Sequence, residues 1–485
     1  MVLLLLMVDA INRVSVIYRI CVVGLGFMLY LLVQIHGKMH TTDLPRIPRW
    51  RTFLNSFRLV RDPIPVMADN VRRYGPTYQL YLGGIFPAIF TQDPGFIQHV
   101  LQKNHRNYIK SPVHFDKLAH FLGRGLLTSE GQTWLRQRRL IQPGFHRQRL
   151  ASLTEKMLEA IEQHVEEIEQ RLEHGPVDMY REMIELTFTI IARAIFSQSV
   201  PPAQLDVLSH NITRLQEYVI KEIRQPFLDP LRKLNGSLKT HEKLRDENNA
   251  ILMRYIEQRR ASRQPHDDLL QMLLDARYED TGEPMTTRQV LDEVTILFVA
   301  GHDTSANALS WLFYLLCQHP EAVTRIQEEI QTVLGDRHPT FSDLANLVYT
   351  RAAIEEAMRL YPPAWITDRM ATNDDEYQGI FIPKGTYLLT YIYGVHHDAR
   401  HWNDPESFRP GRFLPDQKND RHSYAYIPFG GGPRLCIGNH FALMEMQLVV
   451  AQLLRRFTLT MATQEPIHHL ALVTLRPREP MWMVK

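Results

Sequence analysis

The sequence predicts a mainly α-helical protein with a minor β portion, organised as one large domain. Between Pro94 and about Gln331 the apolar residues mostly recur at helical spacing, and strand-like runs occur only outside that region. With 485 residues and 45% apolar content, the chain can bury a large core. Periodic apolar segments continue toward the C-terminus without repeats or low-complexity tracts, which favours a single unit.

The first 38 residues form a separate hydrophobic segment. Residues 20–35 are apolar apart from Gln34, and Arg19 precedes them. A membrane span usually needs ~17–25 residues, so this stretch suffices if the Arg19 side chain reaches the interface. The basic residues that follow would then keep the remaining domain, residues 39–485, on the cytoplasmic side. The alternative is that translation starts at Met39 and that residues 1–38 are an upstream extension of the reading frame.

Charge and cysteine content narrow the functional classes. Lys and Arg (55) nearly balance Asp and Glu (53), so no strong positive field favours nucleic acid as a partner. The three cysteines, Cys21, Cys317 and Cys436, are odd in number and far apart. They do not form a disulfide framework, and they indicate a reducing, cytoplasmic compartment.

Strand-like segments are short and occur in two pairs. Residues 77–82 and 88–91 are separated by Gly83-Gly84, which predicts a β-hairpin. Residues 379–383 and 386–391 have the same character and predict two further strands.

A long helix over residues 286–319 is the clearest element. Thr286 and Gln289 form a capping box at its start, and His319-Pro320 ends it. At 1.5 Å per residue the helix is ~50 Å long, enough to cross a domain. Its centre, residues 300–305, reads Ala-Gly-His-Asp-Thr-Ser and is small and polar within an apolar run.

A glycine-rich loop places Cys436 just before a second strong helix. Residues 429–438 read Phe-Gly-Gly-Gly-Pro-Arg-Leu-Cys-Ile-Gly. A lone cysteine is usually a small buried hydrophobe, but a helix N-terminus favours the thiolate form. The glycines let the backbone lie against a large planar ligand, and Gly438 lets backbone N–H groups face the sulfur. The guanidinium group of Arg434 can form two hydrogen bonds to a carboxylate. The loop therefore predicts a thiolate ligand site.

This loop resembles the haem-binding signature of the cytochrome P-450 superfamily, F-x-x-G-x-R-x-C-x-G. The resemblance implies a haem b cofactor with Cys436 as the axial ligand to its iron. It also implies the cytochrome P-450-type fold, with the haem between the long helix and the helix after Cys436. The implied activity is a monooxygenase that inserts one oxygen atom from O₂ into an apolar organic substrate.

Two further stretches resemble a buried ion triad of the superfamily. Glu356 and Arg359 match its E-x-x-R helix, and three residues of spacing put them on one helix face. The downstream stretch Phe-Arg-Pro-Gly-Arg-Phe supplies Arg412 as the third member. In relatives the residue before this arginine is often acidic, whereas here it is Gly411.

The resemblance also assigns residues to the haem itself. Trp134 and Arg138 match the W-x-x-x-R helix, whose two side chains reach a propionate from one helix face. Arg369 lies where relatives place another propionate-binding arginine. Within the cysteine loop, the cofactor-binding set comprises Phe429, Arg434, Cys436 and Gly438.

The centre of the long helix resembles the oxygen-activating motif of the superfamily. Ala300 and Gly301 are small enough to leave space for O₂ above an iron. Asp303 and Thr304 form an acid–alcohol pair that can position water and pass protons, and they are the predicted catalytic residues. A threonine within a helix is more often back-bonded to that helix, and only a position opposite a haem favours the catalytic interpretation.

Three other functions compete with this one. A haem-thiolate enzyme that uses peroxide or rearranges its substrate would tend to lack the Asp303-Thr304 pair. A haem-based sensor or carrier would need an output domain, which the sequence does not show. His397, Asp398 and His401 could form a zinc site on a helix, but the residues on either side do not predict a helix.

Substrate and electron donor are the least constrained features. Relatives line the pocket with residues 108–127, 205–236, Phe298, 365–367 and 473–475, which are mostly apolar here and indicate a lipid-like or terpene-like molecule. The sequence shows no flavin or nicotinamide module, so we expect a separate ferredoxin-like or flavodoxin-like donor or a reductase. The arginines expected to form a basic docking face for an acidic donor are Arg136, Arg139, Arg147, Arg149, Arg455 and Arg456.

Overall fold

The computed structural model describes residues 43–485 apart from residues 83–85, 198–199, 226–227, 263, 265 and 418–420. The hydrophobic segment 1–38 and the predicted Gly83-Gly84 turn therefore lie outside the described residues. Within the described part of the chain, no helix has the length and apolarity that crossing a membrane requires.

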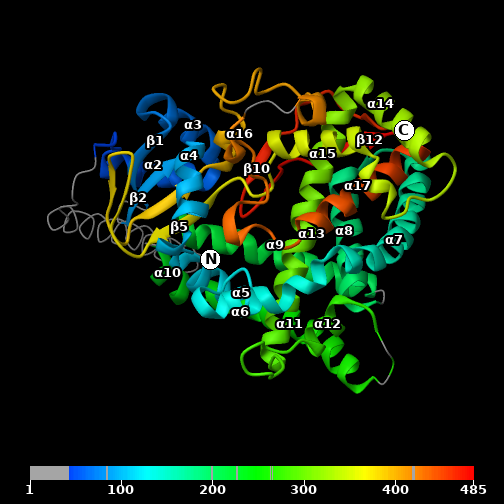
Figure 1. The fold of residues 1–485 in the computed structure, drawn as a ribbon, viewed down its shortest axis with the longest axis horizontal. Helices are drawn as coiled ribbons and strands as arrows, with labels where there is room; N and C mark the ends of the chain where they lie inside the picture. The colour runs from blue at the N-terminus through cyan, green and yellow to red at the C-terminus, as the bar shows by residue number, and fades with distance from the viewer. Residues whose placement is uncertain are drawn as a thin grey trace, which may run out of the picture.

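Helices dominate the structure and fill the right side of the view in Figure 1. The prediction of a mainly α protein with a minor β portion is therefore confirmed. In chain order the helices are α2 (Arg49–Arg61), α3 (Pro63–Tyr74), α4 (Pro94–Gln98), α5 (Ala119–Leu122), α6 (Gly131–Ile141), α7 (Arg147–His174), α8 (Met179–Phe196), α9 (Pro202–Arg224), α10 (Asp229–Leu234), α11 (Ser237–Ala261), α12 (Leu269–Asp275), α13 (Thr287–Gln318), α14 (Pro320–Leu334), α15 (Val348–Leu360), α16 (Ile392–His396) and α17 (Asn439–Arg456).

The largest sheet lies on the opposite side of the view, where Figure 1 labels β1, β2 and β5. Its order is β1-β2-β8-β5-β3, and the smaller sheets are β10-β11, β4-β12-β9 and β6-β7. The strands are β1 (Thr77–Leu82), β2 (Phe86–Thr91), β3 (Tyr108–Ile109), β4 (Val177–Asp178), β5 (Thr367–Ala371), β6 (Asp375–Tyr377), β7 (Ile380–Ile382), β8 (Tyr387–Thr390), β9 (Thr460–Met461), β10 (His469–Ala471), β11 (Leu475–Pro477) and β12 (Trp482–Val484).

All four predicted strands are present. β1 and β2 pair antiparallel as the predicted hairpin, with Thr77 opposite Thr91. The second pair, β7 and β8, does not form a hairpin, because β7 pairs with β6 and β8 lies between β2 and β5. The strand character was thus readable from the local pattern, whereas the pairing depends on distant segments.

The long helix α13 begins and ends as predicted and passes through the core. The Thr286 side chain accepts a hydrogen bond from the Gln289 backbone N–H at 3.2 Å. From Ser305 to Leu316 every residue is buried, as expected for a helix that is apolar on all sides. α13 packs along α8 and also contacts α15 and α17, so the helix after Cys436 lies directly beside it.

Candidate functional site

The cysteine loop is held by close backbone packing. The Cys436 N–H donates to the Phe429 carbonyl at 3.0 Å, which closes the loop. Gly432 has a φ of 66°, and a Cβ there would lie 1.9 Å from the carbonyl oxygen of Leu101. The predicted reason for the glycines was contact with a planar ligand. At Gly432 the structure gives a different reason, which is close approach to the π-helical turn His99–Lys103.

Cys436 differs from Cys317 in its surroundings. The Cys436 side chain is accessible on one side, although protein atoms otherwise surround it closely. Burial raises the pKa of this thiol, and the Gly438 N–H bond and the Arg138 guanidinium oppose the rise. Cys317 has no such compensation, and burial raises its pKa to about 12. Of the two cysteines in the described residues, Cys436 is therefore the one with neighbouring groups that stabilise a thiolate, although burial still raises its pKa.

The side chains assigned to the haem propionates gather around this loop. Arg138 of α6 donates to the Leu435 carbonyl at 2.7 Å. Arg434 stacks over the Trp134 ring with its guanidinium carbon 4.2 Å from the ring centroid. Arg369 of β5 is buried, and burial lowers its pKa to about 10. The structure thus brings α6, β5 and the cysteine loop to one place.

Three further residues belong to this cluster, and the sequence analysis did not assign them to the haem, although Lys110 and His114 fall within the predicted pocket segment 108–127. Lys110 is buried, its ammonium group donates to the Leu126 carbonyl at 2.8 Å, and burial lowers its pKa to about 7. Glu130 caps α6, pairs with Arg434 and accepts the Lys110 backbone N–H at 2.8 Å. His114 lies beside Arg369 and Lys110. No local motif marks these residues, because the fold alone brings them together.

The cluster fits a dianionic planar cofactor. Four cationic side chains, Lys110, Arg138, Arg369 and Arg434, outnumber the carboxylates of Glu130, Asp368 and Glu293 in this region. Burial raises the pKa of Glu293 to about 8, so this carboxyl is mainly protonated at neutral pH. In addition, Arg434 Nη1 and His114 Nδ1 are buried without a hydrogen-bond partner. Buried donors of this kind normally have a partner, and the two propionates of a bound haem would supply both the charge and the acceptors.

The centre of α13 has a small accessible face in an otherwise buried helix. Ala300 is exposed and Thr304, one turn later, is half-buried, while His302 and Asp303 between them are buried. Thr304 donates its hydroxyl hydrogen bond to the Ala300 carbonyl at 2.8 Å. Gly301 was predicted to leave room for O₂, yet a Cβ there would lie 2.9 Å from Ile191 of α8. Helix packing therefore also accounts for this glycine.

Asp303 and Thr304 have separate hydrogen-bond partners. Asp303 is 5% exposed, and its Oδ2 accepts a hydrogen bond from the Thr474 hydroxyl at 2.7 Å. The Gln216 amide of α9 reaches the same oxygen at 3.4 Å. Thr474 fell within the predicted pocket segment 473–475, but its contact with Asp303 was missed because the two residues are distant in sequence.

The predicted ion triad is assembled and buried. Arg359 donates to both carboxylate oxygens of Glu356 at 2.8 Å, and Arg412 Nε reaches Glu356 Oε1 at 3.2 Å. Arg359 also donates to the carbonyls of His396 and Pro405. This network ties α15 to the segment that precedes the cysteine loop.

An apolar cavity of about 450 Å³ lies between the large sheet and α9. Four of the five predicted pocket segments contribute to its lining, through Val113, Leu118, Ile220, Ile223, Trp365, Ile366 and Val473. Residues from α2, α3 and β2 were missed, among them Leu59, Met67 and Phe86. The fifth prediction, Phe298, does not line this cavity, because its ring packs in the core against Phe188 at 4.6 Å.

Comparison with known proteins agrees with this arrangement. The Cytochrome P450 family profile matches residues 45–484, which is most of the chain. The chain belongs to the cytochrome P450 family. Its relatives include the putative cytochrome P450 132 of Mycobacterium tuberculosis, 32% identical over 81% of this chain and 86% of that protein. Cyclooctat-9-en-7-ol 5-monooxygenase of Streptomyces melanosporofaciens is 33% identical over 84% of this chain and 87% of its own length.

Family membership makes this P450 a haem-thiolate monooxygenase, an oxidoreductase that uses O₂, an organic substrate and a redox partner. A mammalian relative, cytochrome P450 4A2 of Rattus norvegicus, is 32% identical over 78% of this chain and 77% of its own length. The predictions of family, fold class and enzyme class are confirmed.

His397 and Asp398 of the competing zinc site have other partners in this P450. His397 Nδ1 bonds to the Tyr393 carbonyl at 2.8 Å, and Asp398 pairs with Arg400 and accepts from Gln92 at 3.1 Å. α16 ends at His396, so the pair is not on one helix face. In the described part of the chain, no cluster of metal-liganding side chains forms around these histidines.

The expected basic docking face of this P450 is largely neutralised. Arg136 pairs with Asp280 at 2.9 Å, and Arg139 pairs with Glu279 at 3.4 Å. The other members with acidic partners are Arg149, with Asp267, and Arg456, with Glu166 and Glu169. These acidic residues come from segments that the sequence analysis did not place beside the arginines.

Proposed function

We propose that this P450 oxygenates a terpene-like or lipid-like molecule at a C–H or C=C bond. The observation that carries the proposal is the apolar cavity of about 450 Å³, whose lining includes Leu59, Ile220 and Trp365. The related cyclooctat-9-en-7-ol 5-monooxygenase and cyclooctatin synthase of Streptomyces melanosporofaciens support a terpene. Among the polar side chains at the wall, Thr367 would orient a hydroxyl or carbonyl group.

We propose haem b as the cofactor, held without covalent links to the porphyrin. Arg138, Arg369, Arg434 and Lys110 would bind the two propionates, and Cys436 would bind the iron. When bound, the haem-thiolate iron supplies the activation of O₂ and the transfer of one oxygen atom. The chain itself orients the cofactor through these cations and keeps bulk water away through the buried residues of α13.

The proposed catalytic pair moves protons from the interior toward the accessible face of α13. Asp303 would hold a proton at its carboxylate, which Thr474 and Gln216 keep in a fixed position. Thr304 would turn its hydroxyl away from the Ala300 carbonyl to orient a water molecule above the cofactor.

Ligation is tested by the CO-difference spectrum of the reduced protein. Cys436→Ser should lose the red-shifted Soret band, whereas Cys317→Ser should keep it, because the half-buried Cys317 thiol donates to the Leu459 carbonyl. A red-shifted band that persists in Cys436→Ser would remove Cys436 from its proposed role.

Substrate class is tested by spectral-shift titration with terpenes, fatty acids and aromatic compounds. A shift given only by aromatic compounds would contradict the terpene-like or lipid-like proposal.

The second candidate function is a peroxide-driven oxygenase or isomerase that needs no electron donor. Asp303 and Thr304 favour the O₂-dependent reaction, because proton delivery is needed only when O₂ is reduced at the site. Turnover with O₂, NAD(P)H and a ferredoxin- or flavodoxin-type donor, compared with turnover on peroxide alone, separates the two. Product formed equally well on peroxide alone would favour the second candidate.

We further propose that residues 20–35 anchor the protein and that the catalytic domain stays cytoplasmic. Two features support this: the apolar run in the sequence, and an exposed apolar row on α2 formed by Trp50, Leu54 and Phe57 beside basic residues. The full chain should sediment with membranes, and a chain that starts at Met39 should do so less. Equal amounts of both in the soluble fraction would favour an upstream extension instead.

A further inference from the structure

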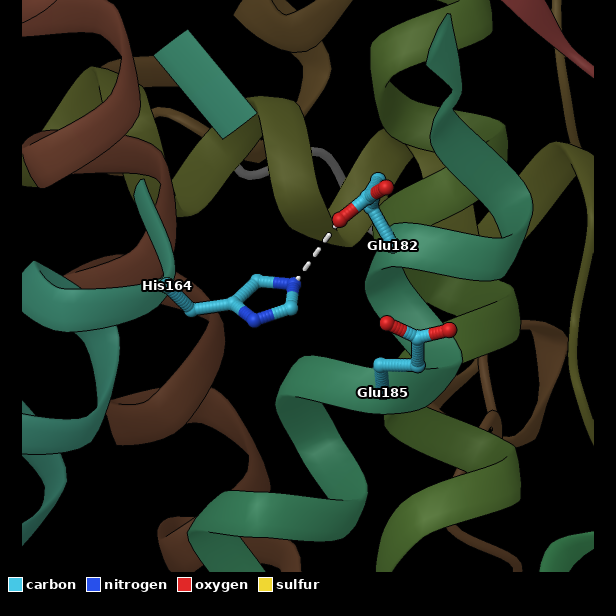
Figure 2. A group of neighbouring side chains, drawn as sticks. All are labelled: His164, Glu182 and Glu185. Carbon is cyan, nitrogen blue, oxygen red and sulfur yellow. Dashed lines mark ion pairs between the residues drawn. The ribbon is translucent and has the colours of Figure 1, made fainter. Parts of the chain in front are cut away.

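Three side chains outside the haem site form a compact group between α7 and α8 (Figure 2). They are His164 of α7 and Glu182 and Glu185 of α8, and one ligand atom from each lies within 4.8 Å of the others. Glu182 and Glu185 are three residues apart on one helix, so both face α7. Within the described residues, this is the one group of at least three His, Cys, Asp or Glu side chains with such spacing.

His164 Nε2 has one charged neighbour, a carboxylate oxygen of Glu182, with which it forms an ion pair. The residue is 7% exposed, and its Nε2 makes no hydrogen bond. Nε2 lies 3.1 Å from Oε2 of Glu182, but the two atoms are not aligned for a hydrogen bond. Figure 2 shows the imidazole reaching from α7 toward the two carboxylates of α8. A buried imidazole nitrogen in this position can donate its lone pair to a metal ion.

A second layer of charged residues holds the three side chains in place. His164 Nδ1 is 3.8 Å from Oε2 of Glu167. Arg171 Nη1 lies 2.6 Å from each carboxylate oxygen of Glu182, and Arg181 Nε lies 2.8 Å from Glu185. Metal sites commonly have this pattern, in which a carboxylate faces the second imidazole nitrogen and outer donors fix the liganding carboxylates.

An open cavity gives access to the group from solvent. It measures about 800 Å³, and its wall includes Glu182 and Glu185. Its charged lining consists of four carboxylates and two guanidinium groups, namely Glu167, Asp178, Glu182, Glu185, Arg171 and Arg181. The excess of negative charge favours a cation over an anion at this position.

We propose that His164 Nε2, Glu182 and Glu185 bind a zinc-class divalent cation that cross-links α7 and α8. Imidazole nitrogens and carboxylate oxygens are both zinc ligands, and these three with water from the cavity would give the four-coordinate geometry that zinc prefers. Calcium and magnesium prefer all-oxygen sites, so the histidine selects against them. Arg171 would keep its bond to Glu182 Oε1 and release Oε2 to the metal. The proposal does not depend on the substrate or on the haem chemistry.

The test uses haem-loaded enzyme stripped of loose metal with a chelator and then titrated with zinc against a chromophoric competitor. One tight equivalent is expected, and the zinc K-edge absorption spectrum should show nitrogen and oxygen ligands at about 2.0–2.2 Å. Zinc should also raise the unfolding temperature, because it binds the folded state only. An enzyme that binds no tight equivalent would overturn the proposal.

Variants separate this site from scattered surface histidines. Glu185→Gln, a half-exposed position that should fold normally, is expected to weaken zinc binding at least ~tenfold, and His164→Gln should do the same. Glu173→Gln, an exposed residue of the same α7, should bind zinc like the native enzyme. If Glu185→Gln binds zinc as tightly as native enzyme, the metal is held elsewhere and the proposal is wrong. Glu185→Gln decides the question even if His164→Gln fails to fold.

Discussion

Glu445 illustrates how burial sets the chemistry of a single residue. Its side chain lies on α17 with no exposed surface, and neither carboxyl oxygen has a well-formed hydrogen bond. Burial raises the pKa of this carboxyl to about 8, and the nearby Ser305 hydroxyl offsets only part of the rise. At neutral pH the folded protein therefore holds this group mainly in its protonated form.

The first prediction concerns the pH dependence that Glu445 imposes on stability. In the unfolded chain the carboxyl titrates at an ordinary pKa of 4.5, so the folded state holds more protons between pH 4.5 and about pH 8. Stability should therefore fall as the pH rises through this window, by on the order of 4 kcal/mol in total. Urea unfolding of the holoenzyme across this window measures the fall.

The matched variants for this prediction are Glu445→Gln and Glu328→Gln. The first removes one of two buried carboxyls whose pKa burial raises to about 8, the other being Glu293, and should roughly halve the pH dependence. The second changes an exposed residue of α14 and should leave it unchanged. If Glu445→Gln loses stability with rising pH as steeply as native enzyme, Glu445 is not the group responsible.

The second prediction concerns Thr474, which fixes the carboxylate of Asp303 through a 2.7 Å hydrogen bond. Thr474→Val keeps the shape of the side chain but removes the donor, so Asp303 should lose its fixed position. A hydrogen bond to a charged group contributes about 1.5 kcal/mol or more, so peroxide released per product should rise roughly tenfold. Electron consumption, peroxide and product measured together check this.

A conservative variant separates hydrogen bonding from packing at this position. Thr474→Ser restores the hydroxyl and should return the peroxide-to-product ratio close to that of native enzyme. Substrate affinity measured by spectral titration should change little in either variant, because the hydroxyl is bonded to Asp303. Native coupling in Thr474→Val would show that Asp303 acts without this bond.

At the scale of elements, the cysteine loop and the turn beneath it form one packed unit. Gly432 has a positive φ of 66°, and a Cβ there would lie 1.9 Å from a backbone oxygen of the turn His99–Lys103. A backbone atom cannot move aside as a flexible side chain can. Because the same loop carries Cys436, a displacement at Gly432 should also move the proposed iron ligand.

The third prediction follows from this contact. Gly432→Ala should destabilise the protein by at least ~1–3 kcal/mol, the usual cost of overpacking, and should lower the haem content. Gly411→Ala is the matched control, because no atom lies within 4 Å of its Cβ and its φ is not positive. Thermal unfolding and the haem-to-protein absorbance ratio measure both effects. Equal haem content in the two variants would contradict the proposed packing role.

Local patterns in the sequence predicted the helices and strands more completely than they predicted which of these elements pair or pack together. The cap at Thr286, the helix of residues 286–319 and all four strands are present, because each depends on neighbours along the chain. The sheet β4-β12-β9 was not predicted, since it joins two-residue and three-residue strands from distant segments. Lys110 was missed for the same reason, because its importance comes from Arg434 and Glu130 beside it.

At the scale of the whole molecule, electrostatic pairing changes the expectation for electron transfer. Lysine and arginine total 55 against 53 acidic residues, so the molecule has no strong net field. Arg136 and Arg139 lie on α6, which contacts the cysteine loop through Arg138, but Asp280 and Glu279 pair with them. Steering of an acidic donor should therefore be weak, and its salt dependence shallow.

The fourth prediction tests whether Glu279 and Asp280 neutralise the positive charge of Arg136 and Arg139. The double variant Glu279→Gln and Asp280→Asn removes both acidic partners and leaves the charges of Arg136 and Arg139 uncompensated. With an acidic ferredoxin-type donor at low salt, the donor concentration needed for half-maximal turnover should fall severalfold, and added salt should reverse the gain. Reduction rates measured across a range of salt concentrations check both effects.

The matched control is Asp246→Asn. This variant removes an exposed negative charge that pairs with Arg245 of α11 and not with an arginine of α6. It should leave donor dependence unchanged, and substrate affinity should remain native in all variants. If removing the acidic partners of Arg136 and Arg139 does not change the donor concentration needed for half-maximal turnover, the donor does not bind at this face of α6. The acceptor surface would then have to be sought among other residues around Cys436, because electrons must still enter near the iron ligand.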